Sequence, residues 1–310
     1  MNARSVRTLI RNSSSLLSIA YDYGRPYPVD IIQRRAISRT IRDDQLSANH
    51  LMPQLVYPIR TIRNNKASLV IFDKDGTLIC FHSMWVPWAR NVTNWIMAET
   101  KLRVADEIYA LLGFNDSENR VRSGLLAEGT MAQIRDAIAR LLISHGIQAS
   151  DAVSYVKRAI MEADKRTTHT VKEIADLRCL FEQLRDNGVK IAICTSDSRR
   201  GTLKTLKTLQ VEHFVDVVVC GDDAGAMPKP HPHNALSICR VLDIDPQEAL
   251  VVGDTLADMG MGRSANLGGT VGVLSGICGN DELRPHADHV VRDVGELLPI
   301  VLDMRRSSLF

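Results

Sequence analysis

Short runs of apolar, mostly β-branched residues recur along the chain from Ser68 onward. Each run is nearly continuous and does not alternate with polar residues, as is typical of parallel strands that are buried on both faces of a sheet. Segments with helical spacing separate the runs, so the sequence predicts an α/β fold with a Rossmann-like parallel sheet. The expected strands are residues 68–72, 189–194, 215–220, 248–253 and 269–274, and the helices between them are residues 171–188, 233–244 and 255–268.

One interval interrupts this alternation of strands and helices. From about Phe81 to Thr170 the sequence has no strand-like run, but several segments show helical periodicity. A helical stretch of that length between the first and second strands predicts an inserted cap domain. We therefore expect an α/β core in residues 67–80 and 171–304, and a helical cap in residues 81–170.

The first 66 residues differ from the rest in charge. They carry 11 Lys/Arg and 4 Asp/Glu, although the whole chain of 310 residues has a formal net charge of only +2. Residues 1–21 are rich in Arg and Ser and contain no acid, a composition that indicates a mitochondrial transit peptide. The alternative is a disordered basic tail. We expect an extension or linker in residues 22–66 and a mitochondrial protein, with a cytoplasmic location as the alternative.

Composition limits the partners that we expect. No window approaches 18 consecutive apolar residues, so no membrane span is expected. The small net charge gives no reason to expect a nucleic-acid partner. Six cysteines are scattered without a C-x-x-C pair, which indicates reduced thiols and not a disulfide or zinc framework. The sequence leaves the oligomeric state open.

Polar side chains follow the predicted strands directly. Two carboxylates, Asp73 and Asp75, stand at the end of a strand that reads as buried, where like charges raise each other's pKa unless something compensates them. In open α/β sheets ligands bind beyond the carboxyl ends of the strands. The sequence therefore predicts one site that also contains the residues after the later strands, namely Thr195, Ser196, Lys229, Asp254 and Asp258.

These residues resemble the four motifs of the haloacid dehalogenase-like (HAD) hydrolase superfamily. The motifs are "DKDGTL", "IAICTS", the pair Lys229-Pro230, and "GDTLAD". The resemblance covers residues 68 to about 300, and "SANLGGTVGVLSG" is similar to the phosphoglycolate phosphatase-like branch. It implies a Mg2+-dependent phosphatase that acts on a small phosphorylated metabolite, with 2-phosphoglycolate as the first candidate.

The resemblance also implies a role for each catalytic residue. Asp73 corresponds to the nucleophile, whose carboxylate attacks phosphorus to form an aspartyl-phosphate. Asp75 corresponds to the general acid that protonates the leaving alcohol and later activates water as a base. Lys229 binds the phosphoryl oxygens and stabilises the intermediate.

Further residues correspond to the phosphate-binding and metal-binding sets. Thr195 and Ser196 join Lys229 in holding the phosphate, and Gly76 lets the chain turn tightly beside them. Carboxylate and carbonyl oxygens are the ligands that Mg2+ prefers. The implied Mg2+ ligands are Asp73, Asp75 through its backbone carbonyl, Asp254 and Asp258, the last of which either joins the metal shell or orients it.

Several alternatives to a phosphatase have to be considered, some for single motifs and some for the whole set. A calcium-binding EF-hand is excluded because Leu78 and Met84 occupy positions that need Gly and Glu. Asp254 and Asp258 are also consistent with acids that complement a helix N-terminus. A phosphomutase shares all four motifs, and a catalytically silent HAD-fold scaffold is the non-enzymatic alternative. A dehalogenase is disfavoured, because attack on carbon needs neither Asp75 nor a metal.

Two further groups of residues have both a structural and a functional interpretation. All three tryptophans follow the first motif within "CFHSMWVPWARNVTNW", where His82 or Trp85 could contact substrate. We favour packing between the cap helices for these aromatic residues. Asp197, Arg199 and Arg200 follow the second motif, and for them we expect a solvated helix start and not substrate contact.

Overall fold

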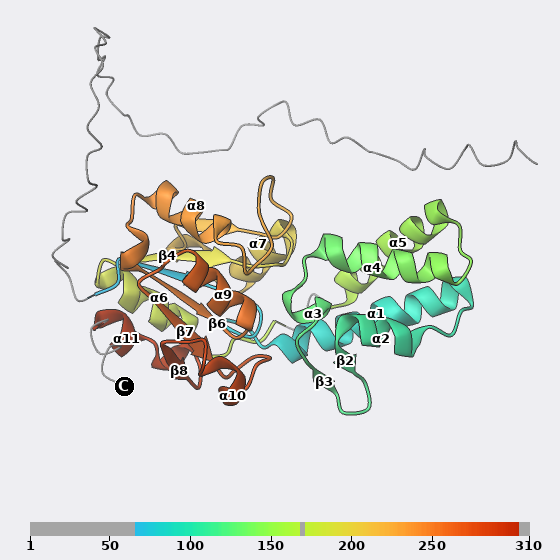
Figure 1. The fold of residues 1–310 in the computed structure, drawn as a ribbon, viewed down its shortest axis with the longest axis horizontal. Helices are drawn as coiled ribbons and strands as arrows, with labels where there is room; N and C mark the ends of the chain where they lie inside the picture. Colours follow the sequence, from blue (N-terminus) through green and yellow to red (C-terminus); the bar gives the residue numbers. More distant parts are fainter. Residues whose placement is uncertain (1–65, 168–170, 304–310) are drawn as a thin grey trace, which may run out of the picture. The chain divides into compact units, whose positions relative to one another are not determined.

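The computed structural model describes residues 66–167 and 171–303 (Figure 1). Residues 1–65, which include the predicted transit peptide and nearly all of the predicted extension, lie outside this part. Within it, all six cysteines are free, as expected. No helix among the described residues is long and apolar enough to cross a membrane.

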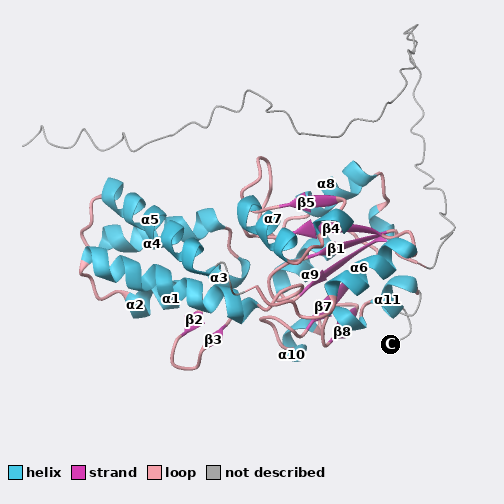
Figure 2. Cartoon of the chain, turned by 180° about the vertical axis from the view of Figure 1, so that it is seen from behind, coloured by secondary structure: helices cyan, strands magenta, loops and turns pink. Residues whose placement is uncertain are grey.

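The described strands include a six-stranded parallel sheet in the order β5-β4-β1-β6-β7-β8, which confirms the predicted fold class (Figure 2). Strand β1 lies between β4 and β6, and its Phe72 is opposite Ile193 on one side and Val252 on the other. The sequence analysis missed β8, a short and only half-buried strand at the sheet edge. The strand bounds are Leu69–Phe72 for β1, Lys190–Cys194 for β4, Val217–Val219 for β5, Ala249–Gly253 for β6, Gly269–Val273 for β7 and His289–Val291 for β8.

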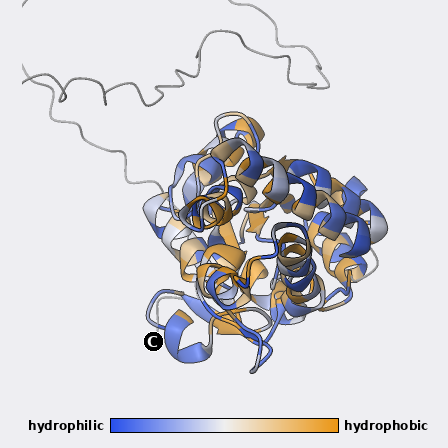
Figure 3. Cartoon of the chain, turned by 90° about the vertical axis from the view of Figure 1, so that its right-hand side faces the viewer, coloured by the Kyte–Doolittle hydropathy of each residue, from blue (hydrophilic) through white to orange (hydrophobic). Residues whose placement is uncertain are grey.

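Helices cover both faces of this sheet, which is why its strands are apolar without interruption. Val70 and Phe72 face one cluster of buried residues, and Leu69 and Ile71 face another. Figure 3 shows the hydrophilic faces of the helices turned outward. The first cluster includes residues of α6 (Leu177–Asp186), α7 (Arg199–Thr208) and α11 (Leu298–Leu302), and the second includes residues of α8 (His233–Leu242) and α9 (Leu256–Ser264).

Helix α6 begins later than the sequence suggested. The periodic segment starts at residue 171, but the helix starts at Leu177 because the Asp176 side chain accepts a hydrogen bond from the Cys179 backbone N at 2.9 Å. This is an N-cap interaction, which fixes the first turn of a helix. The remaining described elements of the core are the short helix α10 (Asn280–Leu283) and the 3-10 turns η1 (Glu212–Phe214), η2 (Pro246–Glu248) and η3 (Val294–Glu296).

Residues 81–167, here called the helical lobe, form a separate group of helices with their own buried cluster (Figure 1). Helix α5 packs against both α1 and α4. The expectation of no strand in this interval is wrong, because β2 and β3 form a small antiparallel hairpin of two-residue strands, too short to show a period. The bounds are α1 Phe81–Thr100, α2 Ala105–Leu112, β2 Phe114–Asn115, β3 Arg120–Val121, α3 Leu125–Glu128, α4 Met131–Ser144 and α5 Ala149–Thr167.

The tryptophans of α1 pack within the helical lobe, as favoured from the sequence. Trp85 and Trp88 meet edge to face with ring centroids 5.3 Å apart, and Trp95 lies 6.4 Å from Tyr155 of α5. Trp88 Nε1 also donates a hydrogen bond to Asp164 Oδ1 at 2.9 Å, which joins α1 to α5. These contacts stabilise the packing of α1, the first helix after β1, against α5.

Candidate active site

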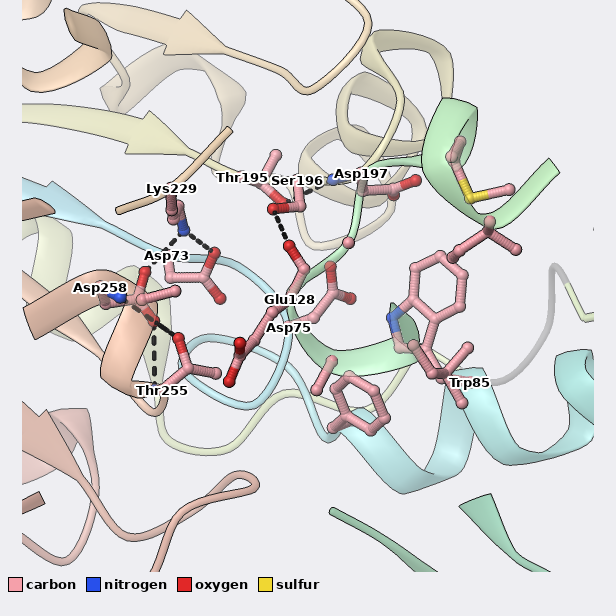
Figure 4. A pocket seen from close by; sticks show the side chains of 17 residues that line it. Asp73, Asp75, Trp85, Glu128, Thr195, Ser196, Asp197, Lys229, Thr255 and Asp258 are labelled. Carbon is pink, nitrogen blue, oxygen red and sulfur yellow. Dashed lines mark hydrogen bonds and ion pairs between the residues drawn. The ribbon is translucent and has the colours of Figure 1, made fainter. Parts of the chain in front are cut away.

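Asp73 is fixed at the end of the central strand. It directly follows β1, and its backbone N donates to Val252 O of β6 at 2.8 Å, so the sheet itself positions its side chain. Only 10% of that side chain is exposed. Figure 4 shows Asp73 beside Lys229 and Asp258 within one cavity. The predicted convergence of strand-end residues is therefore present in the structure.

Lys229 connects two carboxylates in this cavity. Its Nζ lies 2.6 Å from Asp73 Oδ1 and 2.6 Å from Asp258 Oδ1. Burial alone would lower the pKa of Lys229, but the Asp258 and Asp73 carboxylates raise it well above its usual value. Lys229 is therefore a fixed positive charge next to Asp73.

Three carboxylates form a cluster that fits a divalent cation. Oxygens of Asp73, Asp254 and Asp258 lie within 4.8 Å of one another, and all three residues are buried. Burial raises the pKa of Asp73 to about 7 against the lowering effect of Lys229, with Asp258 and Asp75 adding to the rise. Burial and the Asp73 charge raise the pKa of Asp254 well above its usual value. Three carboxylates with one ammonium leave an excess negative charge that Mg2+ or a similar hard cation would neutralise.

Two hydrogen bonds and two nearby glycines hold the Asp254 side chain in place. Thr77 Oγ1 donates to its Oδ1 at 3.2 Å, and the Ile277 backbone N donates to its Oδ2 at 2.8 Å. Gly76, which has φ +86°, and Gly276 both lie so close that a Cβ at either position would collide with Asp254 Oδ2. Sequence analysis identified Gly76 but gave no role to Gly276, the last residue of the "SANLGGTVGVLSG" stretch.

Gly276→Ala is expected to weaken the binding of a divalent cation such as Mg2+ by about tenfold, because the added methyl group displaces Asp254. A calorimetric titration with Mg2+ measures this. Gly279→Ala is the matched control, since a Cβ there meets its nearest neighbour, Glu282 Oε2, at an ordinary 3.7 Å. Equal Mg2+ affinities in the two variants would contradict the role of Gly276.

Asp258 caps a helix, as one sequence interpretation predicted, and it also belongs to the carboxylate cluster. Its Oδ2 accepts hydrogen bonds from Thr255 Oγ1 at 2.6 Å and from the Thr255 backbone N at 3.2 Å, which closes a capping box on α9. Its Oδ1 accepts from Lys229. The residue that caps α9, the helix after β6, therefore also places its carboxylate in the cluster with Asp73 and Asp254.

Asp75 points to a different partner from Asp73. The fully buried Lys74 places its Nζ 2.7 Å from Asp75 Oδ2 and 3.2 Å from Asp197 Oδ2. Burial raises the pKa of Asp75, while Lys74 lowers it. Trp85 Nε1–H faces Asp75, although it forms no hydrogen bond among the described residues (Figure 4). The side chain of Asp75 is therefore outside the carboxylate cluster.

The expectation that Asp197 begins a solvated helix is wrong. Its side chain is 9% exposed, because Lys74 draws it inward, and Ser198 caps α7 in its place. Arg199 instead pairs with Asp223, and Arg200 is exposed. The sequence analysis gave Lys74 no role, although its position between Asp73 and Asp75 indicated that it belongs to the site.

Thr195 and Ser196 also lie at the site. Thr195 is buried at the end of β4, and its Oγ1 accepts from the Asp197 backbone N at 3.2 Å. Ser196 Oγ donates to the main-chain O of Glu128 at 3.1 Å, which joins α3 of the helical lobe to the core. Sequence analysis gave no role to Glu128.

The cavity is closed on one side by the helical lobe. Trp85 lines it in addition to packing on Trp88, so substrate contact stays a prediction for this residue; His82 is not among the residues that line it. The core contributes Asp73, Asp75, Thr195, Ser196, Asp197, Lys229, Thr255, Ala257 and Asp258, and the lobe contributes Phe81, Trp85, Leu126, Ala127, Glu128, Gly129, Met131 and Ile134.

Comparison with known proteins places most of the described chain among hydrolases. A family model described as haloacid dehalogenase-like hydrolase matches residues 67–266. Curated relatives named pyrophosphatase PpaX, from Bacillus thuringiensis (strain Al Hakam) and Bacillus cereus (strain Q1), are 35% identical over 138 residues, which are 44% of this chain and 63% of theirs. The chain thus spans less than two thirds of the length of these relatives.

Solved structures share the fold at low sequence identity. One is described as a predicted phosphoglycolate phosphatase from Haemophilus somnus 129PT, with a TM-score of 0.60 and 18% identity over 76% of this chain and 97% of that one. Another is a HAD-superfamily hydrolase, subfamily IA, from Geobacter sulfurreducens PCA, with a TM-score of 0.52 and 20% identity over 77% and 99% of the two chains.

Proposed function

Because the chain belongs to the haloacid dehalogenase-like hydrolase family, as its motifs predicted, we propose that it is a Mg2+-dependent phosphatase of a small phosphate monoester. One observation carries the proposal. The buried Asp73 carboxylate lies 2.6 Å from Lys229 and inside a carboxylate cluster, of which Asp73 and Asp258 line the cavity between the core and the helical lobe. The names of the pyrophosphatase relatives support phosphate chemistry.

Asp73 acts as the nucleophile in this proposal. One of its oxygens accepts from Lys229, so the other is available to attack phosphorus. The P–O bond of the ester breaks, the alcohol leaves, and the phosphoryl group stays on Asp73 as an aspartyl-phosphate. Lys229 and Thr195 bind phosphoryl oxygens during the transfer, and Lys229 offsets the negative charge that gathers there.

Asp75 moves the protons. It protonates the oxygen of the leaving alcohol and then takes a proton from the water that attacks phosphorus, which releases phosphate and restores Asp73. Its burial raises its pKa and helps it hold a proton, and Lys74 keeps its side chain in place. The helical lobe covers one side of this cavity, which reduces its contact with bulk water and strengthens the charge interactions inside it.

Asp73, Asp254 and Asp258 would hold the Mg2+ ion, together with the backbone carbonyl of Asp75 as the family resemblance implies. When bound, the ion supplies positive charge against the phosphoryl oxygens and the carboxylates. Thr77 and the Ile277 backbone N keep Asp254 oriented for this purpose.

Mg2+ is expected to raise the Tm by a few degrees more at pH 8 than at pH 5.5. Burial raises the pKa of Asp73 in the folded chain from its usual 3.8 to about 7. Between these two pKa values folded Asp73 keeps a proton that the unfolded chain has lost, so the fold loses stability as the pH rises from about 3.8 to about 7. Above that range the cost of the buried charge is fully present. A bound cation removes that penalty. Thermal unfolding at both pH values measures the difference, and equal shifts would contradict the site.

Phosphate release from a panel of small esters, with and without Mg2+, tests the proposal. The panel includes p-nitrophenyl phosphate, 2-phosphoglycolate and a hexose phosphate. Metal-dependent release of free phosphate is the expected result. Isomerisation of the sugar phosphate without release would instead identify a phosphomutase. Neither activity, with the fold intact and Mg2+ bound, would identify the silent scaffold.

A further inference from the structure

The cavity beside Asp73 has walls of different chemistry. The core supplies the carboxylates, hydroxyls and Lys229 described above, and the helical lobe supplies an apolar wall formed by Phe81, Trp85, Leu126, Met131 and Ile134. Glu128 is the one charged side chain that the described part of the lobe adds to this lining. In the proposed mechanism the phosphate lies on the core side, so the leaving group of a substrate lies against the wall of the lobe.

No positive charge is available on the wall of the lobe. Among the described residues that line the cavity, Lys229 is the only Lys, Arg or His, and Asp73 and Asp258 already bind it. Arg200 and Lys204 do not line this cavity; they line a neighbouring cavity next to α7, which shares only Trp85 and Asp197 with it. A carboxylate or phosphate on the leaving group would therefore be buried among aromatic and aliphatic side chains without a counter-charge, which is strongly unfavourable.

Glu128 adds a further reason against an anionic leaving group. Its main-chain O accepts from Ser196 Oγ, so its position is tied to the core beside the phosphate-binding residues. Figure 4 shows its carboxyl group directed into the cavity. Burial raises the pKa of Glu128, and the Asp258 charge adds to that rise, so the surroundings already disfavour negative charge at this point. A second anion here would meet the same unfavourable surroundings.

The same wall offers specific contacts to a different kind of leaving group. Glu128 provides oxygen atoms that can accept a hydrogen bond, and the buried Trp85 Nε1–H has no hydrogen-bond partner among the described residues and faces the site. Phe81 and Trp85 offer apolar ring surfaces. A hydroxyl group can donate to Glu128 and accept from Trp85, and an ammonium group can donate to Glu128.

On the basis of the proposed phosphatase function, we infer that the substrate is a phosphate monoester of an uncharged or amino alcohol, selected by Glu128 and the apolar wall of the helical lobe. Esters of hydroxy acids such as 2-phosphoglycolate, and pyrophosphate, are poor substrates because each presents a second anion to this wall. Glu128 is accordingly a specificity-determining residue.

The test compares kcat/KM for esters of matched size that differ in charge. The esters are 2-hydroxyethyl phosphate, O-phosphoethanolamine and 2-phosphoglycolate, with pyrophosphate as a fourth substrate. The wild type is expected to prefer the first two over the last two by at least about tenfold. In Glu128→Lys the ratio of 2-phosphoglycolate to 2-hydroxyethyl phosphate is expected to rise by at least about tenfold. Glu99→Lys, the same change at an exposed position of α1, is expected to leave the ratio unchanged.

Three outcomes would overturn the inference: a wild-type preference for 2-phosphoglycolate, a preference for pyrophosphate, or a ratio that does not respond to Glu128→Lys. If Glu128→Lys does not fold, the milder Glu128→Gln carries the test and should reduce activity on O-phosphoethanolamine more than on 2-hydroxyethyl phosphate.

Hydrolysis of p-nitrophenyl phosphate distinguishes failure of the inferred charge selectivity from failure of the proposed phosphatase function. Asp73-dependent hydrolysis of that ester without charge selectivity would overturn the inference alone, whereas no hydrolysis of any ester would overturn the phosphatase function and the inference with it.

Discussion

Asp73→Asn is expected to lower kcat by at least about 10⁴-fold on every ester that the wild type hydrolyses. An amide group in place of the carboxylate cannot attack phosphorus, so the aspartyl-phosphate cannot form. The amide has nearly the same shape, and it removes a charge whose burial is unfavourable, as the raised pKa of Asp73 indicates. The free energy of unfolding should therefore stay within about 1 kcal/mol of the wild type or increase.

Stopped assays of phosphate release and urea unfolding measure these two quantities. Asp151→Asn is the matched control, because it makes the same chemical change at an exposed position in the first turn of α5. Residual activity of Asp73→Asn above about a hundredth of the wild type would contradict a nucleophilic role. Loss of activity that merely follows loss of the folded state would leave Asp73 with a structural role only.

Lys74→Met is expected to lower the free energy of unfolding by about 3 to 5 kcal/mol, since it leaves two buried carboxylates without their shared partner. Lys74 is completely buried, and the side chains of Asp75 and Asp197 are 11% and 9% exposed. The attraction of these two carboxylates outweighs burial and raises the pKa of Lys74. Its positive charge is thus part of the native packing.

Urea unfolding of a double-mutant cycle separates the ion pairs from simple packing. Lys74→Met with Asp197→Asn should recover a substantial part of the lost stability, because it removes one of the two unpaired charges. Activity gives a second measure. Since Lys74 holds the proposed general acid Asp75, kcat should fall more for an alkyl phosphate than for p-nitrophenyl phosphate, whose leaving group needs little protonation. A stability change under about 1 kcal/mol would contradict this account.

The sequence alone predicted the sheet and the residues at its strand ends for one physical reason. Parallel strands buried on both faces have few polar residues, so the runs that end at Phe72 and Gly253 read as strands, and Asp73 and Asp254 directly after them mark where a site begins. Because the carboxyl ends of such strands meet at one edge, residues 181 positions apart in the chain could be assigned to one site.

Other features of the site depend on tertiary contacts that have no local pattern. Gly276 matters only because its loop passes directly over Asp254, and Glu128 only because α3 contacts Ser196. Asp197 reads as a solvated helix start unless the buried Lys74 beside it is known. The hairpin of β2 and β3 escapes detection because two-residue strands cannot show a period.

The most direct test of the central claim is to trap phosphate on Asp73. Enzyme that is turning over substrate with Mg2+ is quenched in acid, digested, and examined by mass spectrometry with and without hydroxylamine, which cleaves acyl phosphates. The account predicts a hydroxylamine-sensitive phosphate on the peptide that contains Asp73, and none in Asp73→Asn. Mg2+-dependent phosphate release with no phosphate on that peptide, or with phosphate on another residue, would contradict it.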